Sequence, residues 1–430
     1  MTPEVKKRIE QIRQGIVPEG YKKGKIGIVP IKWNEVPFST LFTSTSEYTD
    51  DLEQYPLYSL TIEDGITAKT ERYERSHLVK KENSYKVVRP NDYAYNPMNI
   101  RFGAVARHKG DIPVAVSGYY DIFTTVHESD LVFMDSFLTY GPMITYYNKV
   151  STGSLVEKQR VHFSDFLEFS LALPPLEERK KIAEILSTQD KAIELQARKI
   201  EELKRFKKGC LEKMFPRKGQ KVPEKRFPGF TDDWERRKLG SIYEAIGNAF
   251  VGTATPYYVE NGHFYLESNN IKDGQINHNT EVFINDEFYE KQKDKWLHTG
   301  DMVMVQSGHV GHAAVIPEEL DNSAAHALIM FRHPKIEIEP YFLNYQYQTL
   351  KSKKKIENIT TGNTIKHILA SDMQQFEVDM PKLEERKKIA EYFRGLDRLI
   401  ALHQCKLEEM KRQKKALMQL LLTGIVRVKA

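Results

Sequence analysis

The chain has 430 residues, of which 40% are hydrophobic and 29% are charged, and its formal net charge is +5. This length predicts two or three domains, because a single core rarely extends beyond about 250–300 residues. No apolar run approaches the roughly 18 residues of a membrane span, and the charged N-terminal stretch lacks the apolar core of a signal peptide. The two cysteines lie in helical patterns, so we expect a reducing, cytoplasmic setting rather than a disulfide framework.

The first part of the chain divides into an N-terminal arm at residues 1–24 and a globular segment at 25–173. Within the globular segment, the runs YSLTI (58–62) and YKVV (85–88) are rich in β-forming residues and are bounded by turn residues. Short strands between polar loops are typical of a domain that mixes α and β structure.

A long helix is predicted at residues 174–215. This segment has no proline after its first turn and is rich in Glu, Lys, Arg, Leu and Ile, which are good helix formers. The prolines at its start suit the first turn of a helix. The basic stretch PRKGQKVPEKRFPG (216–229) follows, and its prolines and glycines predict a linker.

The same organisation then repeats, with a globular segment at 230–380 and a helix and tail at 381–430. The runs MVMV (302–305), AVI (314–316) and FEVDM (376–380) predict strands in the second globular segment. We therefore expect two tandem units, each with a mixed α and β domain followed by a long helix.

The strongest sign of this duplication is the segment LEERKKIAE, which occurs at 176–184 and again at 383–391. Counted from these two segments, 40 residues align without a gap, and about 19 of the pairs are identical. Trp33 and Trp234 pair more weakly upstream. The helices therefore resemble each other strongly, whereas the globular parts barely do.

Apolar residues recur in both helices with the 3-4 spacing of a coiled-coil seam, and the two seams share one register. We predict that the helices pack on each other antiparallel, which gives pseudo-two-fold symmetry; the alternative is that each packs only on its own domain. Forty residues make a rod of about 60 Å. The predicted seam residues are Leu186, Ile193, Ile200, Leu203, Phe393, Ile400, Leu407 and Met410. Polar residues interrupt the seams at Gln189, Gln196, Lys207, His403 and Lys414.

A search for catalytic motifs finds no G-x4-G-K-[ST], H-E-x-x-H, C-x-x-C or G-x-S-x-G pattern. SGHVGHAA (307–314) has two histidines but no convincing third ligand nearby, so a loop that approaches a partner closely is favoured over a metal site. Several other loops combine basic, amide and hydroxyl side chains with aromatics, and these are the residue types that contact phosphates and base edges. The alternative is that they are only solvated loops. The candidate DNA-binding residues are Lys69, Arg72, Arg75, Arg101, Arg107, Lys109, Asn269, Asn270, Lys272, Ser307, His309, His312, Asn363, Thr364 and Lys366.

The repeated P-x-L-E-E-R-K-K-I-A-E segment, followed each time by a basic heptad helix, resembles the specificity subunit of type I restriction–modification systems. The resemblance covers essentially the whole chain from about Trp33 on, although the first globular segment matches only loosely. The other segments that carry it are KRFPGFTDDWERRKLGSI (225–242), GTATPYY (252–258), NNIKDGQI (269–276), LHTGDMVMVQSGHVGHAA (297–314) and TTGNTIKHI (360–368).

The resemblance implies an α+β protein with two tandem α/β target-recognition domains joined through an antiparallel coiled coil. It implies a non-catalytic subunit in which each domain reads one half of a bipartite site on double-stranded DNA. The helices would set the unread spacer and dock two methyltransferase subunits, and two restriction subunits with motor activity would complete the assembly. S-adenosylmethionine, ATP and Mg would then be bound by those partners, with no cofactor, metal or membrane contact on this chain. The alternatives are a coiled-coil adaptor and a solitary DNA-modifying enzyme with an unrecognised active site.

Overall fold

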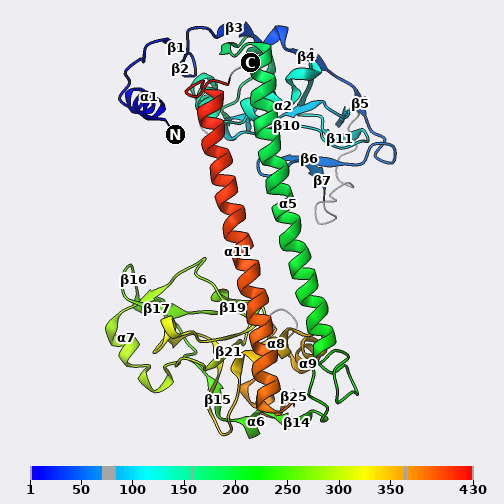
Figure 1. Ribbon diagram of the computed structural model, residues 1–430, viewed down its shortest axis with the longest axis vertical. Helices are drawn as coiled ribbons and strands as arrows, with labels where there is room; N and C mark the ends of the chain where they lie inside the picture. Colours follow the sequence, from blue (N-terminus) through cyan, green and yellow to red (C-terminus); the bar gives the residue numbers. More distant parts are fainter. Residues whose placement is uncertain (1, 70–83, 156–157, 363–365, 429–430) are drawn as a thin grey trace. The chain divides into compact units, whose positions relative to one another are not determined.

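The computed structural model describes residues 2–69, 84–155, 158–362 and 366–428. They form two compact units, each described by itself below (Figure 1). Unit 1 comprises Met1–Gln196 and Lys406–Ala430, and unit 2 comprises Ala197–Cys405. Each unit therefore contains one globular domain, part of one long helix and part of the other.

The two long helices are α5 (Leu176–Met214) and α11 (Leu383–Leu422), as the sequence predicted. Each begins directly after a proline-containing segment, and two glutamates occupy each first turn. Negative side chains are favourable there because the N-terminus of a helix carries a partial positive charge. The repeated segment LEERKKIAE is thus the start of both helices.

The helices pack on each other antiparallel within each unit. In unit 1, the early α5 residues Ile182 and Leu186 share a core with the late α11 residue Leu421. In unit 2, Lys207 Nζ lies 2.6 Å from an Asp397 carboxylate oxygen, and Cys210 contacts Tyr392. Among the seam residues, Leu186, Ile200, Phe393 and Ile400 are buried and Ile193, Leu203, Leu407 and Met410 are half-buried.

The globular part of unit 1 is built around a four-stranded sheet in the order β10–β9–β12–β4 and a three-stranded sheet in the order β11–β8–β5. Aromatic rings fill the space beside the first sheet, where Phe38 and Phe166 meet edge to face with their centroids 5.1 Å apart. The elements are α1 (Pro3–Arg13), β1 (Tyr21–Gly24), β2 (Gly27–Pro30), β3 (Asn34–Pro37), β4 (Phe42–Thr45), β5 (Tyr48–Thr49), β6 (Tyr58–Thr61), β7 (Gly65–Ala68), β8 (Tyr85–Val88), β9 (Tyr93–Tyr95), β10 (Val105–Arg107), β11 (Val114–Ser117), β12 (Asp121–Thr125), α2 (Leu131–Phe137), α3 (Gly141–Val150), α4 (Phe163–Leu167) and β13 (Ser170–Leu173).

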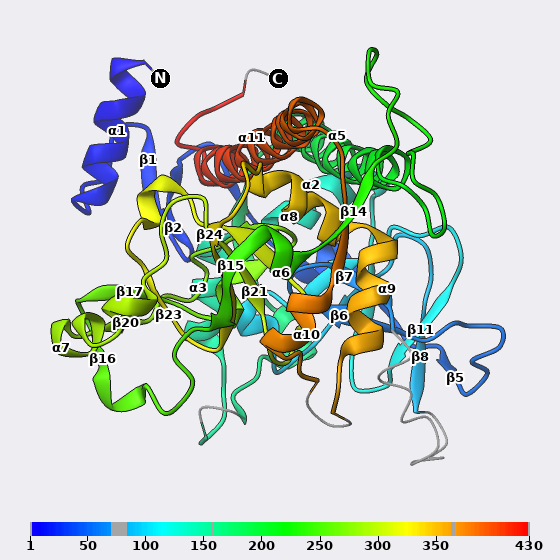
Figure 2. The same ribbon diagram turned by 90° about the horizontal axis from the view of Figure 1, so that it is seen from below.

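Unit 2 has two four-stranded sheets, in the orders β15–β24–β21–β22 and β16–β20–β17–β23. Figure 2 shows α8 and α10 against the first sheet, with α9 beside α8. The elements are β14 (Glu235–Lys238), α6 (Leu239–Ile242), β15 (Tyr243–Asn248), β16 (Tyr258–Val259), β17 (His263–Leu266), β18 (Ile271–Lys272), β19 (Gln275–Ile276), β20 (Phe283–Ile284), α7 (Asp286–Glu290), β21 (Met302–Val305), β22 (Ala313–Val315), β23 (Ala324–Ala325), β24 (Leu328–Pro334), α8 (Pro340–Gln348), α9 (Leu350–Ile359), α10 (Ala370–Gln375) and β25 (Glu377–Met380).

In both domains, a strand near the start of the domain pairs with the last strand of the domain. The strand that follows Trp33 (β3) pairs antiparallel with β13, the last strand before α5, and the strand that follows Trp234 (β14) pairs with β25, the last strand before α11. Both tryptophans are buried. The entry and the exit of each domain therefore lie together, next to the start of a long helix.

The second glutamate of each LEERKKIAE segment is held by an arginine at this junction. Glu385 accepts two hydrogen bonds from Arg226, at 2.6 and 2.7 Å, and Glu178 accepts two from Arg427, at 2.5 and 2.6 Å. Both carboxylates are almost fully buried, with 0% and 2% exposure. The linker supplies Arg226 to unit 2, and the C-terminal tail supplies Arg427 to unit 1. Each segment therefore contributes the arginine that binds the buried glutamate of its unit.

Within the part of the chain that the structure describes, no helix is long and apolar enough to cross a membrane.

Candidate nucleic-acid interface

In unit 2, two of the predicted loop clusters lie side by side. The backbone N–H of Gly308 donates to the carbonyl of Lys366 at 3.1 Å, and that of Ile368 donates to Gln306 at 3.0 Å. Ser307 and His367 also form a β-bridge. These hydrogen bonds hold the turn between β21 and β22 against the segment that leads into α10. His309 and Lys366 are both exposed and lie on one surface.

A third cluster joins them through His312. The backbone N–H of Asp273, in the turn between β18 and β19, donates to His312 Nδ1 at 3.3 Å. Because Nδ1 accepts, the ring proton lies on Nε2. Burial lowers the pKa of His312 below its ordinary value, so the ring is a neutral donor at pH 7.

Asn270 supports this surface from inside. Its side chain is 2% exposed and donates to the carbonyls of Asn277 and Thr280, at 3.0 and 2.8 Å. All of its donors are thus used within the loop, which makes Asn270 a positioning residue. The neighbouring Asn269 and Lys272 are exposed and can reach a ligand.

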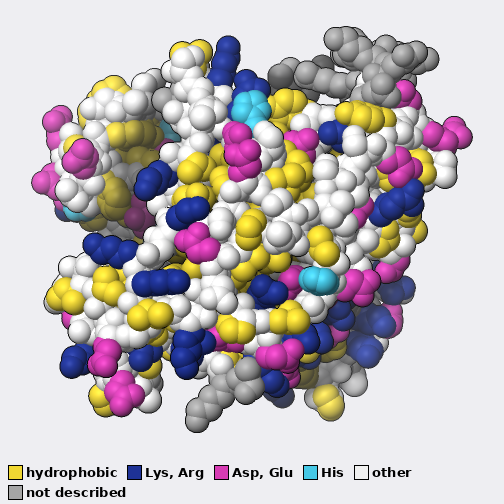
Figure 3. Space-filling view, turned by 90° about the horizontal axis from the view of Figure 1, so that it is seen from above, with side chains coloured by type: hydrophobic (Ala, Val, Ile, Leu, Met, Phe, Trp, Pro, Cys, Tyr) yellow, Lys and Arg dark blue, Asp and Glu magenta, His cyan; other side chains and the backbone are white. Residues whose placement is uncertain are grey.

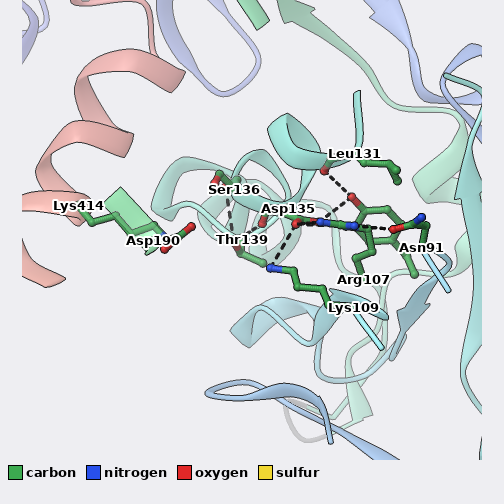
Figure 4. Close-up of polar contacts among 10 residues, drawn as sticks. Asn91, Arg107, Lys109, Leu131, Asp135, Ser136, Thr139, Asp190 and Lys414 are labelled. Carbon is green, nitrogen blue, oxygen red and sulfur yellow. Dashed lines mark hydrogen bonds and ion pairs between the residues drawn. The ribbon is translucent and has the colours of Figure 1, made fainter. Parts of the chain in front are cut away.

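In unit 1 the candidate surface contains Arg107 on β10, whose guanidinium is held in place by hydrogen bonds (Figure 4). Arg107 donates from Nε and Nη2 to the Asp135 carboxylate, at 2.9 and 2.8 Å, and from Nη1 to the Asn91 side-chain oxygen at 2.6 Å. Lys109 Nζ lies 3.3 Å from the same carboxylate, and the Tyr93 hydroxyl donates to it at 2.8 Å. Burial disfavours the Arg107 cation, but the hydrogen bond and charge of Asp135 outweigh it and raise the pKa of Arg107.

This cluster lines a cavity of about 680 Å³. The hairpin of β6 and β7 forms one wall, and the segment from Phe102 to Ile112 forms another. Of the candidate residues of the first domain, Arg107 and Lys109 line this cavity, whereas Lys69 and Arg101 are not among its lining residues. Asp135 was missed by the sequence reasoning, because nothing in the sequence pairs it with Arg107.

The remaining candidates differ in their placement. Lys69 and Lys109 are exposed and Ser307 is half-buried, but Arg101 is buried, and it donates to Gln159. Arg101 therefore supports the loop from below. Arg72, Arg75, Asn363 and Thr364 lie outside the described residues.

Charge is mixed on the face that Figure 3 presents, where Lys and Arg side chains are interspersed with Asp and Glu. Local geometry, rather than an extended basic face, therefore has to define where an anionic ligand would bind there. Among the residues that the structure describes, no group of three or more His, Cys, Asp or Glu side chains could hold a metal ion.

Two relatives from Methanocaldococcus jannaschii are similar to this chain. The "Type I restriction enzyme MjaVIII specificity subunit" is 28% identical over 272 residues, which span 61% of this chain and 64% of that protein, less than two thirds of its length. The "Putative type I restriction enzyme MjaX specificity subunit" is 26% identical over 440 residues, which span 99% of this chain and 93% of that protein.

Two solved structures share the fold. One, from work on "complex assembly and conformational transition of the type I R-M system", has a TM-score of 0.57 and 17% identity. The other, a type I restriction–modification S subunit from M. genitalium, has a TM-score of 0.53 and 12% identity. Each similarity covers 93% of this chain and 99% of the other.

The profile of the family described as "Type I restriction modification DNA specificity domain" matches residues 135–205 and 231–412. The matched residues include the beginning of both long helices and most of the second domain. Because they make up more than half of the chain, the chain belongs to the type I restriction–modification DNA specificity domain family.

Proposed function

We propose that this chain is the non-catalytic DNA-reading subunit of a type I restriction–modification complex. Each globular domain reads one half of a bipartite site on double-stranded DNA, and α5 and α11 together set the spacer. The helices also dock two methyltransferase subunits, and two restriction subunits complete the complex in the cytoplasm. S-adenosylmethionine, ATP and Mg belong to those partners.

The differences between the domains support two different half-sites. In unit 1 the candidate surface is built on Arg107, which is fixed by Asp135, and on the exposed Lys109. In unit 2 it is built on the exposed Asn269 and Lys272, beside the buried Asn270. An arginine with a fixed guanidinium and an asparagine beside a lysine present different groups to DNA, so the two domains suit different sequences.

The exteriors of the helices, by contrast, are alike. Leu195 of α5 and Leu402 of α11 are repeat-equivalent, and their side chains are 63% and 61% exposed. An exposed lysine follows each leucine by four residues, on the same face of its helix: Lys199 after Leu195 and Lys406 after Leu402. Two equal surfaces of this kind suit two copies of the same partner.

This contrast carries the proposal: recognition surfaces that differ are joined to helix exteriors that match. To test it, the chain is co-expressed with the methyltransferase of its host, and methylated adenines are mapped on the DNA. We expect a bipartite, asymmetric motif with a fixed spacer. The purified chain alone should bind DNA in a strongly salt-dependent manner without methylating or cutting it.

Two results would contradict the proposal. Methylation or cleavage by the purified chain alone would mean that it is an enzyme. Partner binding without any DNA-dependent response to salt would mean that it is an adaptor.

A further inference from the structure

Helix α9 presents two different faces to two different surroundings. Lys353, Ile356 and Glu357 follow the spacing of one helical face, and they line a pocket together with the turn between β21 and β22. Lys354 and Lys355 point to the other side, where they line a separate hollow beside the end of α5. Adjacent lysines of one helix therefore lie in different environments.

The first pocket has a volume of about 400 Å³ and is rich in basic groups. Lys353, Lys366, His309 and His312 line it, and Glu357 is the one acidic side chain among its described lining residues. Within the described parts of the chain, neither Lys353 nor Lys366 forms an ion pair. Both ammonium groups thus remain available to an anion.

The charge of Lys353 acts on the His312 ring. Burial is the first cause that lowers the pKa of His312, and the positive charge of Lys353 also lowers it, while the negative charge of Asp273 opposes the shift more strongly than any single cation. Lys353 and His312 are thus close enough to act on one ligand. An anionic ligand in the pocket would offset the charge of Lys353.

The backbone of the turn is held tightly against α9. Gly311 has a φ of 86°, and a Cβ built there would lie 2.7 Å from Ile356 Cγ2. A larger residue would push the turn away from the helix. The distance between the turn and Lys353 is therefore fixed by packing, which is how a pre-formed binding site is built.

We propose that this pocket holds a phosphate group of the DNA backbone. Lys353 and Lys366 supply the charge, and the neutral His312 donates a hydrogen bond from Nε2. The described lining residues include no Arg, Asn or Gln, which are side chains that commonly pair with base edges. Lysine suits a phosphate as a point charge on a flexible stem. The pocket therefore positions the second domain on DNA without reading its sequence.

This inference rests on the proposed DNA-reading function, and the test separates the two. Full-length Lys353→Ala and the matched control Lys354→Ala are compared with the parent chain. Each is titrated against a duplex that contains the mapped site and against a mixed-sequence duplex, at several salt concentrations. We expect Lys353→Ala to weaken binding to both duplexes by the same factor, about three- to tenfold, and to reduce the slope of log K against log salt by about one.

The control should behave as the parent chain does, and the methylated motif should be the same for all three proteins. The inference fails if Lys353→Ala leaves the salt slope unchanged, if it changes the recognised bases, or if Lys354→Ala has an equal effect. If the parent chain itself did not bind either duplex, that result would instead overturn the proposed function.

Free phosphate is the other source of the same chemistry, and inorganic phosphate at constant ionic strength distinguishes it. Saturable stabilisation of the parent chain by phosphate, together with an unchanged DNA salt slope in Lys353→Ala, would assign the pocket to a free anion and overturn the inference. Because Lys353 is exposed, its replacement should leave the melting temperature unchanged.

Discussion

The residues of LEERKKIAE divide into an inner and an outer set. Glu178 and Glu385 are buried against arginines, and Ile182 and Ile389 lie in the cores of their units. Docking of two partner subunits on the helices, which the family resemblance implies, would account for the outer set alone. The buried residues give a second reason for the repetition. Each domain packs on the start of its helix through the same buried glutamate and isoleucine.

Glu385→Gln should destabilise unit 2 by about 3 kcal/mol, because breaking one partner of a buried pair leaves Arg226 without its counter-charge. The first glutamate of the same segment offers a matched control, since the Glu384 side chain is 74% exposed. Glu384→Gln should change stability by less than about 0.5 kcal/mol. Denaturant unfolding, with hydrogen exchange to locate the change in unit 2, measures both. Equal losses of stability in the two variants would mean that the buried pair of Glu385 and Arg226 contributes no more than an exposed glutamate does.

Glu267 and His326 form a polar pair in unit 2, where Oε1 of Glu267 lies 3.4 Å from Nδ1 of His326. The hydrogen bond to Glu267 raises the pKa of His326 above 6.5, and the same bond lowers the pKa of Glu267 below 4.5. The folded chain therefore holds the histidine proton more tightly than the unfolded chain does. This stabilisation is complete below about pH 6.5 and is lost as the pH rises through the folded pKa.

The glutamate has the opposite sign, so its contribution is present above about pH 4.5 and is lost as the pH falls through its lowered pKa. We expect unit 2 to lose stability as the pH rises from about 6 to about 9, because the histidine deprotonates. Unfolding measured across this range should show the loss in the parent chain and a smaller one in His326→Gln. A loss of the same size in the variant would assign it to other groups.

At the scale of elements, the two helices repeat one ion pair. Lys207 pairs with Asp397 in unit 2, and their repeat-equivalents Lys414 and Asp190 pair in unit 1 (Figure 4). The first pair is mostly buried, with side-chain exposures of 12% and 16%, whereas the second is 25% and 49% exposed. The Tyr345 hydroxyl also donates to Asp397 at 2.7 Å. One interaction thus has two environments.

Lys207→Met should therefore cost about 3 kcal/mol, because it leaves a buried carboxylate with one hydrogen-bond donor fewer and no charge partner. Lys414→Met makes the same chemical change in the exposed pair and should cost less than about 1 kcal/mol. Equilibrium unfolding of the two full-length variants compares them directly. The reverse order of stability would show that burial does not control the strength of this pair.

The elements also show how far sequence patterns reach. The helices, and strands such as β8 (85–88) and β21 (302–305), follow from periodicity and β-forming residues, because these act within a few positions. The meeting of the loop at 306–312 with the segment at 360–368 depends on contacts between residues far apart in the chain. Local patterns do not contain such contacts.

The same limit applies to the candidate site residues. Arg101 and Asn270 have the residue types of DNA contacts, yet both are buried and bonded inside their loops. Lys353 was not selected, because a run of lysines on a helix reads as a solvated face. Its signal is that only one lysine of the run shares a face with Ile356, which packs against the glycine turn.

At the scale of the whole molecule, the matching helix exteriors predict equal effects on partner binding. Leu195→Glu and Leu402→Glu should each weaken one of two methyltransferase sites, because a charge replaces an apolar contact, while DNA binding by the chain alone stays unchanged. Mass measurement of the assembled complex should find one methyltransferase lost in each single variant and both lost in the double variant. Full occupancy in the double variant would place the partners elsewhere.

The helices also predict how the chain measures DNA. Their 39 and 40 residues correspond to about 60 Å. Insertion of seven residues after Gln196 and after its repeat-equivalent His403 keeps the seam in register and adds about 10 Å to each helix. Because that length corresponds to about three base pairs, methylation mapping should find a spacer longer by about three base pairs between unchanged half-sites.

One further variant makes this prediction decisive. Exchange of residues 25–173 for the corresponding domain of another family member should change one half-site and leave the spacer as it was. If the seven-residue insertion altered the half-site bases while the spacer stayed fixed, the helices would not be the ruler, and the spacing would have to come from the recognition domains.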